Sequence, residues 1–207
     1  MSKIKLTKGE LKKQRDSLKQ FRHYLPTLQL KKQQLQMKIL ECRRSMEERM
    51  KVVAEKEASI EVWAGLLADL RIDIKGWISP TQILVDYTNI AGANIPYYKD
   101  IHFAEAQYDF YLTPLWVDKA IEEFRLLAAF LAEVVVIKRQ IEILEKELRI
   151  TTQRVNLFEK IKIPECLENI RKIRIYLGDQ QANAVGISKV AKKKVEARNL
   201  EEVLVVA

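Results

Sequence analysis

The chain has 207 residues and a formal net charge of +8, and 48% of its residues are hydrophobic. It contains only 6 Gly and 5 Pro, far below the share of roughly 12% in an average protein, so it can make few turns. Charged residues reach 31%, above the usual ~25%, which favours long helices. No apolar run approaches the ~20 residues of a membrane span, and no signal peptide is evident. We therefore expect a soluble, cytoplasmic, mainly helical protein.

The first predicted element is a long helix over residues 1–77. Two columns of a seven-residue repeat, three residues apart, are mostly apolar over about ten heptads, well past the three or four that indicate a coiled coil. Thr7 and Glu10 have the spacing of a capping box at the start. Pro26 lies inside this tract but off the seam, so we expect a kink rather than a split. The seam positions predicted here are Leu11, Leu18, Leu28, Leu35 and Ile39.

The middle segment, residues 78–113, loses the heptad pattern. Residues 83–85, 101–103 and 108–112 carry strand-type side chains, and residues 91–94 read as a turn. We expect a small hairpin-containing head at the far end from the termini. Its Tyr and Phe residues either form an exposed cluster for a protein partner or build the core of the head itself.

A second long helix is predicted over residues 114–177, with Thr113 as N-cap and Pro114 at the first helical position. Its predicted seam positions are Val134, Ile141, Leu148 and Val155. Pro164 interrupts the pattern, which resumes one position out of phase at Ile163, Cys166, Ile170, Ile173 and Leu177. Gly178 is a predicted helix end. The tail over residues 178–207 is either flexible or helical.

Each helix carries one apolar stripe that must be buried, and the simplest solution is that the two stripes face each other. The predicted fold is therefore mainly α: a long antiparallel two-helix coiled coil formed by the N- and C-terminal helices, with a small α+β middle head. In this arrangement Cys42 and Cys166 would lie ~27 Å apart along the axis, which excludes a disulfide between them. Both are expected to be buried, reduced thiols.

The charge is unevenly distributed. Residues 1–60 hold 16 Lys and Arg against 7 Asp and Glu, whereas residues 61–113 hold 3 against 7. The basic end either meets an acidic partner, protein or nucleic acid, or is simply a solvated helix face. No phosphate-binding loop is present, and His23 and His102 lack neighbouring ligands for a zinc site. We expect no active site, metal or cofactor in this chain.

Two blocks of sequence resemble a known family. Residues 154–164, Arg-Val-Asn-Leu-Phe-Glu-Lys-Ile-Lys-Ile-Pro, and the following residues 167–171 are similar to a C-terminal block of the D subunits of A/V-type rotary ATPases. Residues 7–18 resemble the N-terminal segment of that family, and residues 24–28 resemble its bacterial branch.

The resemblance implies a non-catalytic rotor shaft that transmits torque between a catalytic ring and a membrane rotor. Implied partners are the catalytic and non-catalytic ring subunits, the small F subunit of the stalk and a membrane-rotor adaptor protein, with no nucleic acid and no membrane insertion. The implied location is cytoplasmic, peripheral to the inner membrane. Candidates for ring contact are Lys12, Lys13, Arg15, Lys19, Arg22, Arg154, Asn156, Glu159 and Lys160. Alternatives are a free-standing coiled-coil adaptor or a basic hairpin that binds nucleic acid or an anionic membrane.

Overall fold

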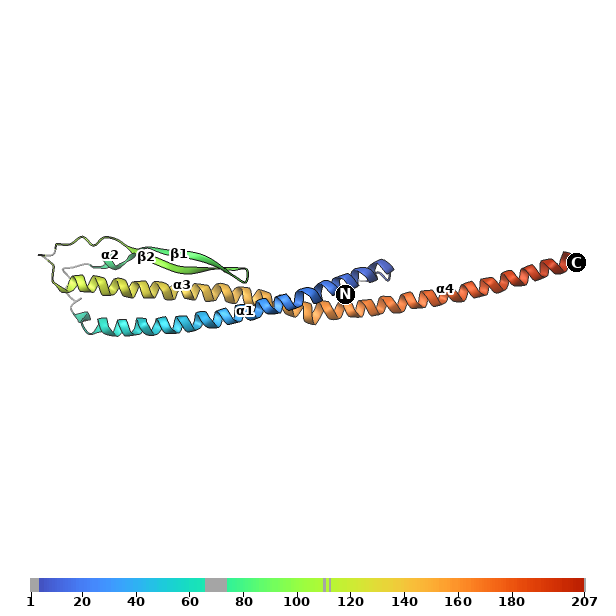
Figure 1. The fold of residues 1–207 in the computed structure, drawn as a ribbon, viewed down its shortest axis with the longest axis horizontal. Helices are drawn as coiled ribbons and strands as arrows, with labels where there is room; N and C mark the ends of the chain where they lie inside the picture. The colour runs from blue at the N-terminus through green and yellow to red at the C-terminus, as the bar shows by residue number, and fades with distance from the viewer. Residues whose placement is uncertain (1–3, 66–73, 110, 112, 207) are drawn as a thin grey trace. The chain divides into compact units, whose positions relative to one another are not determined.

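The computed structural model describes residues 4–65, 74–109, 111 and 113–206, with side chains described through residue 198. It forms two compact units: a terminal unit, residues 1–29 with 153–207, and a middle unit, residues 30–152. The elements, in chain order, are α1 (Lys8–Glu61), α2 (Lys75–Ile78), β1 (Pro80–Ile90), β2 (Ala93–Phe103), α3 (Trp116–Asn156), the π-helical stretch η2 (Leu157–Lys162) and α4 (Ile163–Val206) (Figure 1). Long N- and C-terminal helices with a β-hairpin between them confirm the predicted fold class.

Helix α1 begins as the capping box predicts. The backbone N–H of Glu10 donates to Oγ1 of Thr7 at 3.3 Å, and Oε1 of Glu10 accepts from the Gln14 side chain at 2.9 Å. The bond to Thr7 satisfies a backbone N–H that the first turn leaves without a helical partner, whereas the bond from Gln14 joins two side chains one turn apart. The helix runs without interruption through Pro26, so Pro26 does not split it.

Helix α1 ends earlier than the heptad pattern predicts, at Glu61 rather than residue 77. Leu67 and Leu70, where the seven-residue apolar repeat continues, lie outside the described residues. Ile74 and Trp77 continue the apolar spacing, but they pack in a separate cluster against Val117 and Ile121 of α3. Burial against α3 therefore explains why the apolar repeat continues beyond the end of α1.

Within the middle unit, α1 and α3 pack antiparallel. Ion pairs join Lys31 to Glu147, Arg49 to Glu133 and Lys56 to Glu123, at 3.9, 3.1 and 3.0 Å. The partner number on α3 falls as the number on α1 rises, which is the signature of opposed chain directions. The buried core between these helices includes Leu35, Ile39, Cys42, Ile137, Ile141 and Leu144.

Strands β1 and β2 form an antiparallel hairpin of two 11-residue strands, longer than the sequence pattern predicts. The turn predicted over residues 91–94 is confirmed at Ala91 and Gly92, whereas residues 93 and 94 already belong to β2. Ala91 and Gly92 have φ of 51° and 79°, the left-handed values that a two-residue hairpin turn requires. Oδ1 of Asn89 accepts from the Gly92 N–H at 3.0 Å and fixes this conformation. The prediction of strand structure over residues 108–112 is wrong at Tyr108, Asp109 and Tyr111, and Phe110 and Leu112 lie outside the described residues.

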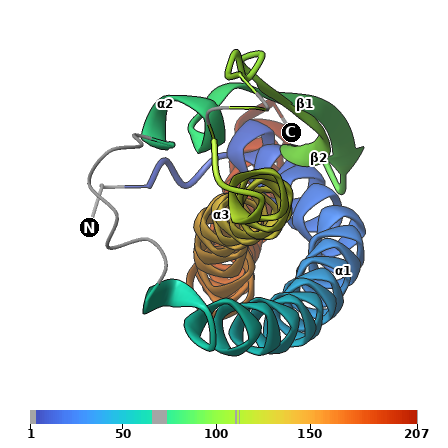
Figure 2. The same ribbon diagram turned by 90° about the vertical axis from the view of Figure 1, so that its left-hand side faces the viewer.

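The hairpin is not a separate head with a core of its own. Ala93 and Ile95 of β2 are buried in the same cluster as the α1 and α3 side chains, and Figures 1 and 2 show the hairpin alongside both helices. The side chain of Gln140 on α3 anchors it: Nε2 donates to the Pro96 carbonyl at 2.6 Å, and Oε1 accepts from Sγ of Cys42 at 3.5 Å. One buried amide thus links α1, α3 and β2.

Some aromatic side chains of the middle segment are packed within the unit and others are exposed. The Tyr108 ring contacts the Trp77 ring in a tilted arrangement with ring centroids 5.2 Å apart, and the Arg125 guanidinium lies 5.3 Å from the Phe103 ring centroid, so these rings pack within the unit. Among the described rings of this segment, Tyr87, Tyr97 and Tyr111 are exposed.

Helix α3 begins at Trp116, two residues later than predicted. Thr113 is not its N-cap: its Oγ1 donates to the Asp109 carbonyl at 2.8 Å, closing the preceding turn instead. The Val117 N–H donates to the Pro114 carbonyl at 3.1 Å, so Pro114 precedes the helix rather than starting it.

The phase shift in the second heptad tract has a structural counterpart in η2. The N–H of Ile163 donates to the carbonyl of Phe158, the i to i+5 bond of a π-helix. A π turn takes up one extra residue, which matches the one-residue shift between the repeats on either side. Pro164 follows directly, and its ring would crowd the Lys160 carbonyl in a regular α-helix.

Helix α4 continues to Val206, so the predicted end at Gly178 is wrong. A glycine inside a helix costs about 1 kcal/mol relative to alanine, and the residues around Gly178 and Gly186 include good helix formers of the types Leu, Gln, Ala and Lys. Neither glycine has a positive φ, so neither adopts the conformation that ends a helix.

Candidate functional site: a basic groove between α1 and α4

In the terminal unit, the beginning of α1 packs beside η2 and α4. The rings of Phe21 and Phe158 have centroids 5.0 Å apart. On α4 the residues Cys166, Ile170 and Ile173 are buried, at 5%, 6% and 0% exposure. The stripe that resumes after the phase shift is therefore a packed seam.

The nine predicted seam residues are all at least partly buried. Leu35, Ile39, Ile141 and Val155 are buried. Leu11, Leu18, Leu28, Val134 and Leu148 are half-buried. The heptad columns thus select inward-facing positions on both sides of Pro26.

The nine candidates for ring contact are all exposed: Lys12, Lys13, Arg15, Lys19, Arg22, Arg154, Asn156, Glu159 and Lys160. The structure brings three of them, Arg15, Lys19 and Arg22, to one groove. The other six do not line it.

The groove has a volume of about 510 Å³ and lies between α1 and α4 of the terminal unit. Its lining from α1 is Arg15, Leu18, Lys19 and Arg22, and its lining from α4 is Leu167, Ile170, Arg171, Arg174 and Ile175. On both helices these positions follow the spacing of three and four residues that places side chains on one helix face. The groove therefore combines an aliphatic floor with five cationic side chains.

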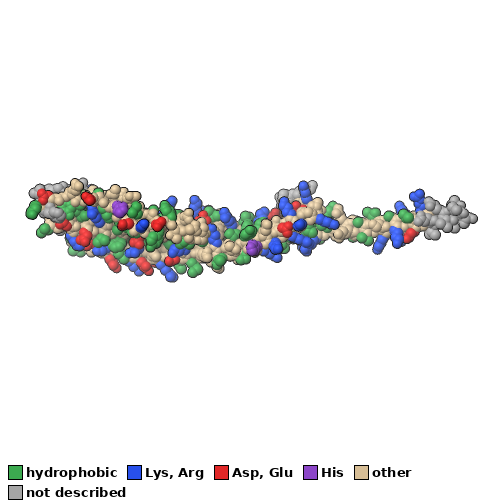
Figure 3. Space-filling model, turned by 45° about the horizontal axis from the view of Figure 1, so that its top comes forward, with side chains coloured by type: hydrophobic (Ala, Val, Ile, Leu, Met, Phe, Trp, Pro, Cys, Tyr) green, Lys and Arg blue, Asp and Glu red, His purple; other side chains and the backbone are tan. Residues whose placement is uncertain are grey.

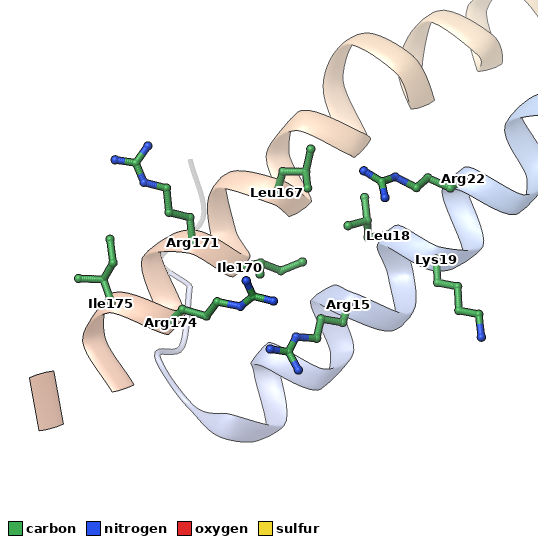
Figure 4. A pocket seen from close by; sticks show the side chains of 9 residues that line it. All are labelled: Arg15, Leu18, Lys19, Arg22, Leu167, Ile170, Arg171, Arg174 and Ile175. Carbon is green, nitrogen blue, oxygen red and sulfur yellow. The ribbon is translucent and has the colours of Figure 1, made fainter. Parts of the chain in front are cut away.

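Figure 4 shows how these side chains lie. Arg15, Arg22 and Arg174 extend into the space between the two helices, whereas Lys19 and Arg171 point away from it at the rims. Leu18 and Ile170 face each other across the floor. Three guanidinium groups thus surround a small apolar surface.

The cations of the groove form no salt bridge with any side chain in the described part of the chain. The nearest carboxylate along α4, Glu168, is engaged by Lys172 at 2.6 Å. That hydrogen bond, with a smaller contribution from Arg171, holds the pKa of Glu168 below its usual range. Arg15, Arg22 and Arg174 therefore present positive charge that no carboxylate in the described part of the chain pairs with.

Sequence reasoning missed Arg171 and Arg174. Both flank the seam residues Ile170 and Ile173, so a search for cations beside the seam on the second helix would have found them. The net positive charge of residues 1–60 indicates a basic surface on α1 only. The charge of residues 114–177 is nearly balanced, so it gives no indication of Arg171 and Arg174.

Neither cysteine is suited to nucleophilic chemistry. Cys42 and Cys166 are free and buried, and burial raises the pKa of both thiols. A neutral thiol is a poor nucleophile. Among the described residues, no group of three His, Cys, Asp or Glu side chains is placed to hold a metal ion.

The surface seen in Figure 3 agrees with the charge pattern of the sequence. Asp and Glu side chains gather mainly over the middle unit, whereas Lys and Arg side chains lie along both units. In the described part of the chain, no helix is apolar over a length that could cross a membrane.

Comparison with known proteins supplies the family. The family model for the D subunit of ATP synthase matches residues 10–193. The V-type ATP synthase D subunit of Borreliella burgdorferi is 44% identical over 199 residues, which cover 96% of this chain and 98% of that protein. The corresponding proteins of Chlamydia caviae and Chlamydia abortus are 36% and 37% identical, with 97% of both chains covered in each case. The chain therefore belongs to the family of ATP synthase D subunits, the family that its terminal sequence blocks resemble.

Proposed function

We propose that this chain is the non-catalytic central rotor shaft of a V/A-type ATPase or ATP synthase. The observation that carries the proposal is the helical pair of the terminal unit, whose seam is buried and whose outer surface is basic. Family membership over nearly the whole chain supports the same role. The shaft would transmit torque between a catalytic ring and a membrane rotor that carries protons or sodium ions.

A shaft must resist bending and twisting under load. Two helices that share one packed seam are stiffer than either helix alone, because bending one must displace the side chains of the other. The buried residues Val155, Cys166, Ile170 and Ile173 supply such a seam in the terminal unit.

The surface of a shaft must also slide past changing contacts. Lys and Arg side chains carry their charge on flexible stems, so they can exchange partners without the cost of separating a dry apolar interface. We propose that the exposed cations Lys12, Lys13, Arg15, Lys19 and Arg22 face acidic residues of the catalytic and non-catalytic ring subunits. Arg154, Asn156, Glu159 and Lys160 are proposed as further ring contacts.

The remaining partners follow from the same proposal. The middle unit would bind the small F subunit of the stalk and a membrane-rotor adaptor protein. The complex would then hold this chain in the cytoplasm at the inner membrane. Asymmetry of the shaft would give each ring site a different nucleotide affinity, a population shift driven by rotation.

Native purification tests the proposal. The tagged chain is isolated from its own cells at moderate salt, and the eluate is analysed by mass spectrometry and assayed for Mg-ATP hydrolysis. We expect two large ATPase-type subunits and a small partner, with activity. An eluate free of ATPase subunits and activity, from cells that express the chain, would contradict the proposal and favour a free-standing coiled-coil adaptor.

Charge reversal tests the proposed contacts between the exposed cations of α1 and the ring. Changing Lys12, Arg15 and Lys19 together to Glu should weaken assembly of the complex or uncouple ATP hydrolysis from rotation. Coupled activity equal to that of the unmodified complex would rule out these contacts.

A further inference from the structure

We propose that the groove between α1 and α4 receives a protein segment in which an aliphatic side chain is flanked by carboxylates, and that Arg174 of α4 is part of this recognition surface. The inference rests on the proposed function and assigns the chemistry of the ring segment that seats in the groove. It goes beyond the proposed contacts between exposed cations and acidic ring residues, since it requires an occupant that is both apolar and acidic.

The first argument is charge. Arg15, Arg22 and Arg174 point into one space, and the described residues provide no carboxylate partner for them. Guanidinium groups that converge without a counter-charge repel one another, and the free chain bears that cost. An acidic occupant removes it, because each guanidinium can bind a carboxylate through two parallel hydrogen bonds.

The second argument is the floor. Leu167 and Ile175 line the groove and remain 44% and 55% exposed, beside the buried Ile170. A purely ionic ligand would leave this aliphatic surface in contact with water. A segment that also inserts an aliphatic side chain would bury it, which favours association.

The two features together select the class of partner. Nucleic acid would use the cations, but its phosphates and sugars offer little to an aliphatic floor. An amphipathic acidic segment of a protein satisfies both, with carboxylates toward the arginines and an aliphatic side chain toward Leu18 and Ile170. The groove thus favours a protein occupant over a nucleic acid.

The test uses the full chain and, as probe, the ring assembled from the two large ATPase-type subunits of its own complex. Three variants are compared: Arg15→Gln with Arg174→Gln, Leu167→Gln with Ile175→Gln, and a control, Lys193→Gln with Lys194→Gln. The control pair is exposed on α4, outside the groove. A second control, Ile187→Gln, removes an aliphatic side chain that is 70% exposed elsewhere on the helix.

The arginine variant should weaken binding to the ring about tenfold or more and reduce its dependence on salt, because charge-assisted hydrogen bonds are lost. The aliphatic variant should also weaken binding but leave the salt dependence unchanged. Both controls should bind within about twofold of the unmodified chain. Circular dichroism confirms that each variant is folded.

The outcomes separate the two proposals. If the unmodified chain does not bind the ring, the proposed function fails. If it binds and the arginine or the aliphatic variant matches its control, the groove is not the recognition surface. If the arginine variant instead loses only binding to a 20-base-pair DNA duplex, measured in parallel, the occupant is nucleic acid and the inference is overturned.

Discussion

The π-helical stretch η2 gives a sharp test of how the second heptad tract keeps its seam in one line. The apolar repeat runs through Val155 and resumes at Ile163, eight residues later rather than seven. If η2 takes up the extra residue, deletion of one residue inside it should restore a strict heptad without moving any seam side chain. Glu159 suits this deletion because it is exposed and lies in the middle of η2.

A deletion elsewhere on the helix should not be tolerated in the same way. Lys172 is exposed and lies nine residues beyond the start of α4. Its deletion rotates the following residues by ~100°, which takes Ile173 and Leu177 off the seam. The chain can keep Ile173 and Leu177 on the seam only if η2 becomes regular α-helix. That change takes Cys166 and Ile170 off the seam instead.

The magnitudes follow from burial. Either choice after deletion of Lys172 removes one buried isoleucine, Ile173 or Ile170, together with a half-buried leucine, Leu177, or a smaller thiol, Cys166. One buried isoleucine contributes about 1.5–3 kcal/mol. We therefore expect a loss of more than about 2 kcal/mol in the free energy of unfolding, against less than about 1 kcal/mol for deletion of Glu159. Because Pro164 itself favours a widened turn, both deletions are also made with Pro164→Ala.

Urea denaturation followed by circular dichroism at 222 nm measures the difference. The slope of the transition must stay constant for the comparison to report stability alone. Equal losses for the two deletions, in both backgrounds, would show that η2 does not set the phase of the seam.

Three further predictions concern the core, the tail and pH. Ile141→Asp buries an unpaired carboxylate in the seam, so it should lower the melting temperature strongly, whereas Val135→Asp, at a position 62% exposed, should change it little. Gly178→Ala should raise helix content and stability by about 1 kcal/mol, since no atom would crowd the added Cβ; a loss of stability by thermal melting would show that the helix ends at this glycine. A hydrogen bond from Lys56 lowers the pKa of Glu123 from its ordinary value of 4.5, so its contribution to stability is present above that pH and is lost as pH falls through the lowered pKa. Glu123→Gln should therefore flatten the fall in melting temperature between about pH 5 and pH 3, and an unchanged profile would exclude the contribution.

The sequence predicts those parts of the fold that depend on spacing along one helix. The capping box at Thr7 and the half-buried or buried state of every predicted seam residue follow from periods of three and four residues. The one-residue shift near Pro164 is visible as a break in the same period, although the pattern does not say that a π turn accommodates it. The turn at Ala91 and Gly92 follows from local backbone preferences.

The ends of helices and strands are less predictable because several small free-energy contributions compete there. Gly178 disfavours the helix by about 1 kcal/mol, and the helix formers around it outweigh that cost. The apolar residues Ile74 and Trp77 keep helical spacing after α1 has ended, since α3 offers them another surface to bury against. A hydrophobic period records burial, and burial can be provided by more than one partner.

The hairpin illustrates a contact that no local pattern encodes. Its strands were expected to form a head apart from the helices, yet Ala93 and Ile95 complete the core between α1 and α3. Gln140 holds this arrangement through the Pro96 carbonyl, and a polar residue on a helix face gives no sign in the sequence of the strand it will bind. Such contacts join residues 44 positions apart and depend on the whole middle unit being folded.

The basic groove is only partly predictable from the sequence. The sequence predicts that Arg15 and Arg22 are exposed on one face of α1, and the same period places Arg171 and Arg174 beside the seam of α4. What the sequence does not supply is the axial register of the two helices, which decides whether these cations converge or alternate with acidic residues. In the folded chain Arg15, Arg22 and Arg174 converge around an aliphatic floor. A surface whose charge pattern arises only when two helices pair can recognise a partner only after folding, so loss of ring binding by groove variants would report on the paired shaft rather than on either helix alone.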